Sequence, residues 1–418
     1  MTNNELRVVI LGGGAAGFMA AITAAETNRG AQVLILEKSH QLLSKVRISG
    51  GGRCNVTHAC FDPATLIQQY PRGAKELRGA FTRFQPRDTV EWFKTRGVKL
   101  KTESDGRMFP ITDDSETIVK CLVESAKRVG VKVWKEVNVE SIIANPKGLV
   151  NRSGLELRLK NGEILHCDRL LLASGSNKKG YEFAERLGHT IEEPVSSLFT
   201  FQINDQRIKD LSGISVPEAE LTLGKLTQRG ALLITHWGLS GPAVLKLSAW
   251  GARVLHECNY NTELKVNWLA MMSESDLKEK LLKIKDSAPR QIIAAHAQFS
   301  LPSRLWERLA AAAGVADSLR WAELSKKDLT ALVDQIHRGS FQIIGKGVFK
   351  EEFVTCGGVR LSEVNFKTME SKACRGLFFA GEILDVDGVT GGFNFQSAWT
   401  TGWVAGKAMT NETMKNEE

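Results

Sequence analysis

The sequence predicts an α/β fold with a parallel sheet at its centre. An apolar run over residues 6–11 leads into a glycine-rich turn and then into an alanine-rich segment. A second apolar run, residues 33–36, ends at Glu37. Continuous Val, Ile and Leu runs are typical of parallel strands that are covered on both faces. We therefore expect a strand–helix–strand unit over residues 7–37, with its first strand central in the sheet.

The turn after the first strand has the spacing of a dinucleotide-binding fingerprint. Gly12, Gly14 and Gly17 follow the pattern G-x-G-x-x-G, which permits a tight turn, close approach of a pyrophosphate and close helix packing. The N–H groups and the dipole at the start of the helix favour negative charge. Glu37 follows at the position where a carboxylate accepts hydrogen bonds from a ribose diol. These features predict a Rossmann-like dinucleotide-binding domain; the alternative is a glycine-rich turn without a ligand.

Composition sets the broad class. The chain has 418 residues, of which 43% are apolar and 24% charged, as in ordinary globular proteins of two or three domains. The net charge of +8 suits anionic ligands and tolerates nucleic acid, but the basic residues are dispersed, so nucleic acid is not the expected partner. Seven scattered cysteines form no CxxC pair, so we expect no metal site. With no secretory leader and no membrane-length apolar run, a cytoplasmic location is expected.

The remaining segments predict a mixed order of elements. We expect helices over 89–95, 115–129 and 395–408, and a strand over 131–143. Asn161-Gly162 is a strong hairpin signal between strands 155–159 and 164–172. Short strands over 198–203, 218–223 and 231–234 precede an amphipathic helical stretch, 273–336, and strand character returns near Phe341.

The C-terminal part contains a second cofactor motif. Residues 377–382 form an apolar strand that ends in Ala-Gly-Glu, and Gly391-Gly392 precedes the last predicted helix. In flavoproteins of the two-dinucleotide-binding type, such an acid reaches the ribityl and pyrophosphate region. The helix N-terminus then faces the flavin O2, where reduction of the flavin places negative charge. An ordinary glycine-rich loop is the alternative, but together with the first fingerprint this motif predicts FAD.

The chain resembles the flavoprotein family that contains BaiN-like and aminoacetone oxidase-type (YhiN-like) enzymes. The blocks that carry the resemblance are residues 12–17, 49–55 (SGGGRCN), 235–242 (THWGLSGP), 355–359 (TCGGV) and 381–396. The chain departs from the family pattern at Leu43-Ser44, where the family usually has Gly-Arg, and in a shorter loop at residues 177–179. The resemblance implies a discontinuous FAD-binding domain (1–194 and 345–418), an inserted β-rich, barrel-like domain (195–270 and 335–344) and a small helical domain (271–334).

We assign the following cofactor-binding residues. The pyrophosphate is expected at Gly12, Gly14, Ala15, Ala16 and Gly17, and the adenosine ribose at Glu37. Lys38 and Lys45 add positive charge near the phosphates, or are ordinary surface lysines. The block Ser49, Gly50, Gly51, Gly52, Arg53, Cys54 and Asn55 is expected to lie across the flavin or the phosphates, with Arg53 as an anion partner; a structural loop is the alternative. Ser174 and Gly175 are expected on the adenosine side, Gly381 and Glu382 at the ribityl chain, and Gly391, Gly392, Phe393 and Asn394 at the isoalloxazine. The resemblance further implies adenine contacts from the strand at Val139.

Two residues have an open role. Cys54 has no partner cysteine nearby in the sequence, so packing is favoured over a redox-active thiol. His236 is a weak candidate for a catalytic acid or base, and a structural histidine satisfied by backbone bonds is the commoner outcome.

Only one G-x-G-x-x-G fingerprint occurs, so no separate nicotinamide domain is predicted. We expect an FAD-dependent oxidoreductase that transfers hydride between flavin and a small organic substrate (an amine, ketone or enone), with O2 or transiently bound NAD(P)H as the other redox partner. The alternatives are a flavin-dependent tRNA-modifying or RNA-associated protein and a non-enzymatic flavin-binding redox module.

Overall fold

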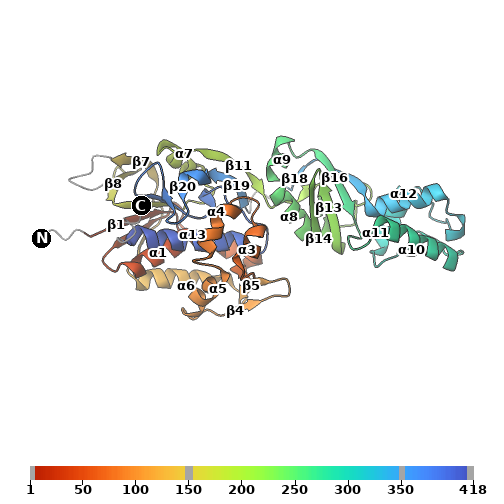
Figure 1. Cartoon of the computed structure of the whole chain (residues 1–418), viewed down its shortest axis with the longest axis horizontal. Helices are drawn as coiled ribbons and strands as arrows, with labels where there is room; N and C mark the ends of the chain where they lie inside the picture. Colours follow the sequence, from red (N-terminus) through yellow and green to blue (C-terminus); the bar gives the residue numbers. More distant parts are fainter. Residues whose placement is uncertain (1–4, 146–153, 348–353, 412–418) are drawn as a thin grey trace. The chain divides into compact units, whose positions relative to one another are not determined.

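The computed structural model describes residues 5–145, 154–347 and 354–411 (Figure 1). Its contacts divide the chain into two compact units, residues 1–194 with 354–418 and residues 195–353. That the second unit consists of separate β-rich and helical domains stays a prediction. Within the described ranges, none of the helices has the length and apolar character needed to cross a membrane.

A seven-stranded sheet forms the centre of the first unit, and it confirms the predicted strand–helix–strand unit. Strand β1 lies between β2 and β10, with Val9 opposite both Leu34 and Leu170. Five strands are parallel, and two antiparallel strands extend one edge. In spatial order the strands are β6 (Lys132–Trp134), β2 (Gln32–Leu36), β1 (Arg7–Leu11), β10 (Arg169–Leu172), β22 (Leu377–Phe379), β21 (Glu370–Ser371) and β20 (Val364–Asn365).

Smaller sheets complete the strands of this unit. One contains β3 (Thr57–His58), β5 (Arg107–Pro110) and β4 (Leu100–Thr102), and another contains β7 (Val139–Asn145), β8 (Gly154–Leu159) and β9 (Ile164–Cys167). Strand β11 (Ile191–Ser197) pairs with β19 (Val354–Val359). The hairpin at Asn161-Gly162 is confirmed.

Several predicted strands have different limits in the structure: 218–223 and 231–234 are longer, as β13 (Ser215–Leu223) and β14 (Leu226–Thr235), 377–382 ends at Phe379, and three more are divided or shortened. The stretch 164–172 divides at Asp168, because its second half joins the parallel sheet beside β1. The stretch 131–143 divides in the same way into β6 and β7, which belong to different sheets. The stretch 198–203 retains only β12 (Phe201–Gln202), since Leu198 has a left-handed backbone with φ of 57°.

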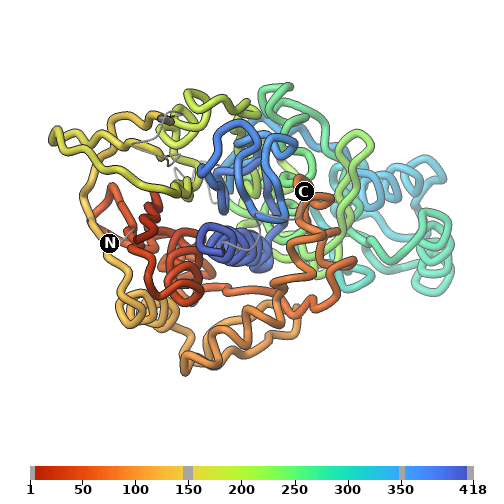
Figure 2. The backbone as a smooth tube through the Cα atoms, turned by 60° about the vertical axis from the view of Figure 1, so that its left-hand side comes forward, coloured from red at the N-terminus to blue at the C-terminus, as the bar shows by residue number. Residues whose placement is uncertain are grey.

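Two helices of the first unit, α1 (Ala15–Thr27) and α13 (Phe393–Thr410), pack along each other (Figure 2). A Cβ on Gly402 would lie 2.5 Å from the carbonyl oxygen of Ala16, and one on Gly406 would lie 2.5 Å from that of Ala20. From the first contact to the second, the residue number rises by four in each helix, so the two helices run parallel. The other helices of the unit are α2 (Ser44–Ile48), η1 (Ser49–Gly52), α3 (Pro63–Leu66), η2 (Ile67–Gln69), α4 (Ala74–Phe81), α5 (Pro86–Lys94), α6 (Ser115–Arg128), α7 (Lys178–Arg186), η4 (Leu361–Glu363) and η5 (Gly381–Ile383).

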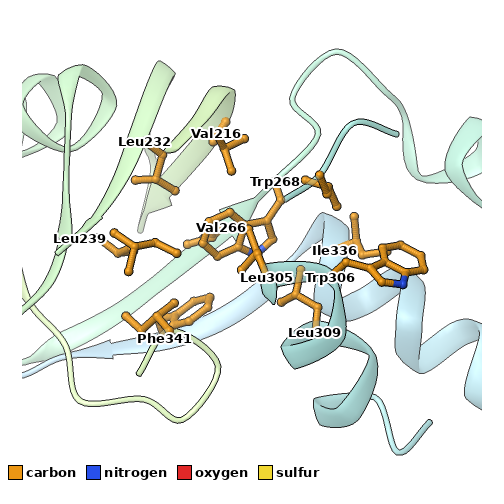
Figure 3. Packing of buried hydrophobic residues seen from close by; sticks show 14 of the residues in the cluster. Val216, Leu232, Leu239, Val266, Trp268, Leu305, Trp306, Leu309, Ile336 and Phe341 are labelled. Atoms are coloured by element: carbon orange, nitrogen blue, oxygen red, sulfur yellow. The ribbon is translucent and has the colours of Figure 1, made fainter. Parts of the chain in front are cut away.

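The second unit contains a seven-stranded sheet, in which each pair of neighbouring strands is antiparallel, and several helices. The strands in spatial order are β17 (Gly339–Ile343), β16 (Thr262–Asn267), β13 (Ser215–Leu223), β14 (Leu226–Thr235), β15 (Gly238–Ser240), β12 and β18 (Gly345–Lys346). The helices are α8 (Pro242–Trp250), α9 (Ala252–Glu257), α10 (Glu274–Ser287), α11 (Ser303–Ala312), η3 (Trp321–Glu323) and α12 (Lys326–His337). Trp268 and Phe341 of the sheet region and Trp306 of α11 share one buried cluster (Figure 3). Apolar burial of this extent fixes the helices to the sheet.

Candidate functional site

The three fingerprint glycines have different physical roles. A side chain on Gly12, whose φ is +120°, would collide with the backbone of Ala173, and one on Gly17 would collide with the carbonyl oxygen of Gly12. Gly14 is the N-cap of α1 and makes no side-chain cap. A Cβ on Gly14 would meet no described atom within 4 Å. Gly14 therefore faces open space beside the N–H groups of the first turn of α1, as a phosphate site requires.

Glu37 lies next to this turn. Its two carboxylate oxygens accept hydrogen bonds from the backbone N–H groups of Gly13 at 2.7 Å and Ser39 at 2.8 Å. A carboxylate has acceptor capacity for about four hydrogen bonds, so lone pairs remain for a ribose diol. The backbone bonds hold the carboxylate in place for that contact.

The glycines of the SGGGRCN block form an open, left-handed loop. Gly50, Gly51 and Gly52 have φ values of 58°, 70° and 85°. Gly50 packs on Phe109, whereas a Cβ on Gly51 or Gly52 would meet no described atom within 4 Å. Such backbone loops collect N–H groups into a concavity for a polar ligand. The hydroxyl of Ser49 donates to the carbonyl oxygen of Val46 at 3.0 Å.

Arg53 has carboxylate partners of its own. Its Nη1 lies 2.7 Å from Glu103 Oε1 and 3.4 Å from Asp113 Oδ1, and its guanidinium lies 4.0 Å from the centre of the Phe109 ring. The hydrogen bond that Arg53 donates to Glu103 is the main reason that the pKa of Arg53 is raised. That Arg53 also serves as an anion partner for the cofactor stays a prediction.

Cys54 is buried, and burial raises the pKa of its thiol to about 12. The side chain is therefore a neutral thiol at physiological pH, which agrees with packing rather than thiolate chemistry.

Residues 55–58 join the SGGGRCN block to the start of α13, and each contacts that helix or its cap. With its amide oxygen turned toward Gly392, the Asn55 side chain accepts from the Gly392 N–H at 3.0 Å. The next three contacts are Trp399 Nε1 to the Val56 carbonyl oxygen at 2.9 Å, Thr57 Oγ1 to Gln396 Oε1 at 2.6 Å, and the His58 ring stacked on Phe393 at 4.7 Å. Two predicted cofactor motifs from opposite ends of the chain are thus side by side.

The loop before α13 is held from several directions. Gly391 and Gly392 have φ values of 132° and 94°, and a side chain on Gly392 would press on the carbonyl oxygen of Thr57. The Asn394 amide accepts from the Gly388 N–H and donates to the Gly388 carbonyl oxygen, both at 2.8 Å. Tyr70 donates to the carbonyl oxygen of Phe393 at 2.7 Å. These contacts fix the N-terminus of α13, which carries the positive end of the helix dipole.

Glu382 connects three other predicted regions. Its carboxylate forms an ion pair with Lys45 and accepts from the Thr355 N–H at 3.0 Å. A Cβ on Gly175 would lie 3.6 Å from the same carboxylate. The Gly381 N–H donates to Thr401 of α13 at 2.9 Å. Lys45, Gly175, Gly381 and Glu382 are therefore brought together.

The remaining candidates are less informative. Gly180 packs directly on the hydroxyl of Ser174, which is buried and has no hydrogen-bond partner among the described residues. Val139 begins β7 and is buried, and Lys38 is exposed. Their roles stay predictions.

The two helix N-termini are offset along a common direction. Gly402 packs beside Ala16, which is one residue from the start of α1, whereas Gly402 is nine residues from the start of α13. The N-terminus of α13 therefore extends eight residues beyond that of α1. At about 1.5 Å per residue this offset is about 12 Å. One N-terminus would suit a pyrophosphate, and the other would suit a group that gains negative charge, such as a reduced flavin. The open space at Gly14, Gly51 and Gly52 makes the described residues fit FAD.

In the second unit, His236 and Trp237 form the two-residue turn between β14 and β15. Both are exposed, Trp237 to 55%. His236 also lines an open, mainly polar pocket of about 270 Å³ with Lys209, Asp210 and Ser212. A catalytic role for His236 stays a prediction.

Sequence reasoning missed His58, Tyr70 and Gln396. His58 follows the SGGGRCN block by three residues, so the continuing motif was a usable signal. Tyr70 and Gln396 act through partners more than 300 residues away, and no local pattern indicates such contacts.

Comparison with known proteins gives matches over almost the whole chain. A family model described as HI0933-like protein Rossmann domain matches residues 6–408. A 3-dehydro-bile acid delta(4,6)-reductase of Clostridium scindens is 30% identical over 414 residues, covering 96% of this chain and 98% of the relative. A ribosomal RNA dihydrouridine synthase of Escherichia coli is 29% identical, covering 94% and 96%.

Among solved structures, a 3-ketosteroid-delta4-(5alpha)-dehydrogenase of Rhodococcus jostii RHA1 has a similar fold. Its TM-score is 0.53 at 17% identity, with 97% of each chain covered.

Proposed function

Because the chain belongs to the HI0933-like Rossmann family, we propose that it is an FAD-dependent oxidoreductase that reduces a carbon–carbon double bond conjugated with a carbonyl group. The observation that carries the cofactor assignment is the parallel packing of α1 and α13, which offsets two glycine-capped helix N-termini by about 12 Å. FAD, when bound and reduced, supplies the hydride.

The chain's own residues would hold the two ends of the cofactor. The N–H groups at Gly14 to Gly17 bind the pyrophosphate, and Glu37 binds the adenosine ribose. Glu382, fixed by Lys45 and Thr355, reaches the ribityl side. The N-terminus of α13, held by Asn55 and Tyr70, stabilises negative charge on the reduced flavin.

The substrate class rests on what the names of two relatives have in common. One is named as a reductase of a 3-dehydro-bile acid at delta(4,6), and the other as a synthase of dihydrouridine. In each reaction a C=C bond conjugated with a carbonyl is saturated, and a hydride adds at the carbon remote from that carbonyl. The names of these two relatives therefore favour an enone over an amine as the substrate. We propose reduced nicotinamide as the electron donor.

Product analysis tests this proposal. The FAD-loaded protein is incubated anaerobically with NADH or NADPH and a panel of cyclic enones, saturated ketones and amines. We expect enones to gain two hydrogen atoms by mass spectrometry and saturated ketones to remain unchanged. Oxidation of amines with no reduction of any enone would contradict the proposal.

A second candidate is the same reaction on a uracil base of ribosomal RNA. The 29% identity to a ribosomal RNA dihydrouridine synthase favours it, and a net charge of +8 tolerates a polyanion. Nucleoside mass spectrometry of ribosomal RNA treated with the loaded protein decides between the candidates. Dihydrouridine formation without reduction of free enones would support this second substrate.

A further inference from the structure

Arg53 combines a fixed guanidinium with unused hydrogen-bond donors. It follows directly on the open glycine loop Gly50–Gly52. One nitrogen, Nη1, contacts both Glu103 and Asp113, and the plane of the group packs on Phe109. Among the residues that the structure describes, Nε and Nη2 have no hydrogen-bond partner. The side chain is 34% exposed, so these donors are open to a ligand.

The charge balance around Arg53 argues against a role for a fully anionic phosphate. The ion-pair network around Arg53 is balanced, because three cations (Arg53, Lys101 and Arg107) share three carboxylates (Glu103, Asp105 and Asp113). A guanidinium held in this way acts best on an oxygen that carries partial charge and gains more during the reaction.

We propose that Arg53 binds the carbonyl oxygen of the substrate, not a phosphate of FAD, and stabilises the enolate that forms as the double bond is reduced. This inference rests on the proposed function. Hydride from the reduced cofactor brings two electrons and one hydrogen nucleus to the β carbon, and the π electrons of the double bond move toward the carbonyl oxygen. A proton from water then completes the α carbon, and a reduced nicotinamide restores the reduced cofactor.

Arg107 offers a matched control. It contacts the other oxygen of Glu103 at 3.1 Å, lies 5.4 Å from the centre of the same Phe109 ring and is 37% exposed. It differs from Arg53 in lying on β5 and not on the glycine loop. If substitution of Arg53 acted only by disturbing the ion pairs of Glu103, substitution of Arg107 should cause the same loss of activity.

The test uses FAD-loaded wild type, R53Q, R53K and R107Q. A substituted phenolate is the probe, because it resembles an enolate and gives a long-wavelength charge-transfer band when it stacks on oxidised flavin. We expect R53Q to weaken phenolate binding by at least about 10-fold and to lower kcat by about 100-fold, with FAD affinity unchanged. R53K should recover part of both losses, and R107Q should stay within about twofold of wild type.

Each of the following results would overturn the inference. Phenolate binding by R53Q equal to wild type would exclude the oxygen contact. A loss of FAD affinity in R53Q would make Arg53 a cofactor ligand. Equal losses in R53Q and R107Q would assign the effect to the ion-pair network. If wild type reduces no conjugated carbonyl, the proposed function fails as well; if R53Q reduces enones like wild type, the inference fails alone.

Discussion

Gly402 of α13 packs on the backbone of Ala16 of α1, at a separation that leaves no room for a side chain. This contact joins the C-terminal helix of the chain to the helix of its dinucleotide fingerprint. It also sets the offset between the two helix N-termini on which the proposed cofactor site depends.

Replacement of Gly402 by alanine should therefore destabilise the protein. The new methyl group would lie 2.5 Å from the Ala16 carbonyl oxygen and force the helices apart. We expect a loss of about 1–3 kcal/mol in the free energy of unfolding, measured by urea denaturation. G79A is the control, because Gly79 lies in α4, is exposed and would place its methyl group in open space. Helix propensity should make G79A more stable by about 0.5–1 kcal/mol, and equal effects in both variants would contradict the packing argument.

Substitution of Gly14 should mainly weaken FAD binding, whereas substitution of Gly17 should mainly destabilise the fold. In G14V the Cβ meets no described atom within 4 Å, so the apoprotein should lose about 1 kcal/mol or less, whereas FAD affinity should fall by at least about 100-fold. In G17A the methyl group collides with Gly12, so the fold itself should be destabilised. Isothermal titration with FAD and thermal melting of the apoprotein separate the two effects. Unchanged FAD affinity in G14V would place the pyrophosphate elsewhere.

Cys54 should resist alkylation. Its thiol is buried and has a pKa of about 12, so almost no thiolate is present near neutral pH. Iodoacetamide should modify the partly exposed Cys60 and Cys258 first, as measured by peptide mass spectrometry. C54A should keep its FAD affinity. Rapid labelling of Cys54 in the folded protein would show that its burial is wrong.

Stability should fall as the pH drops through about 6.5, the ordinary pKa of a histidine in the unfolded chain, because of His189. Its ring contacts Ser371 at 2.7 Å and lies 3.3 Å from Glu363, and burial lowers its pKa despite that carboxylate. The unfolded chain then binds the proton more readily than the folded protein, so acid favours unfolding. Urea denaturation on both sides of this pH should show the slope in wild type and a weaker slope in H189Q. Carboxylates with a lowered pKa, such as Glu363, reduce the stability of the fold only at lower pH, where they become protonated.

The sequence was most informative where a structure depends on residues that are close together in the chain. The fingerprint predicted the position of β1, and Asn161-Gly162 predicted the β8–β9 hairpin, because both depend on residues close in the chain. Strand limits were wrong where tertiary pairing decides them, as at Asp168. The contacts of Tyr70 and Gln396 could not be predicted, since they bridge segments that only the fold brings together. The exposed position of His236 likewise required the structure.

The most direct test of the central claim follows the flavin in a single turnover. The FAD-loaded protein is reduced anaerobically with a stoichiometric reductant and mixed with a cyclic enone in a stopped-flow instrument. We expect the absorbance of oxidised flavin to return at a rate that rises with enone concentration and saturates, whereas the matching saturated ketone should cause no return. Flavin that stays reduced with every conjugated carbonyl tested would contradict the account.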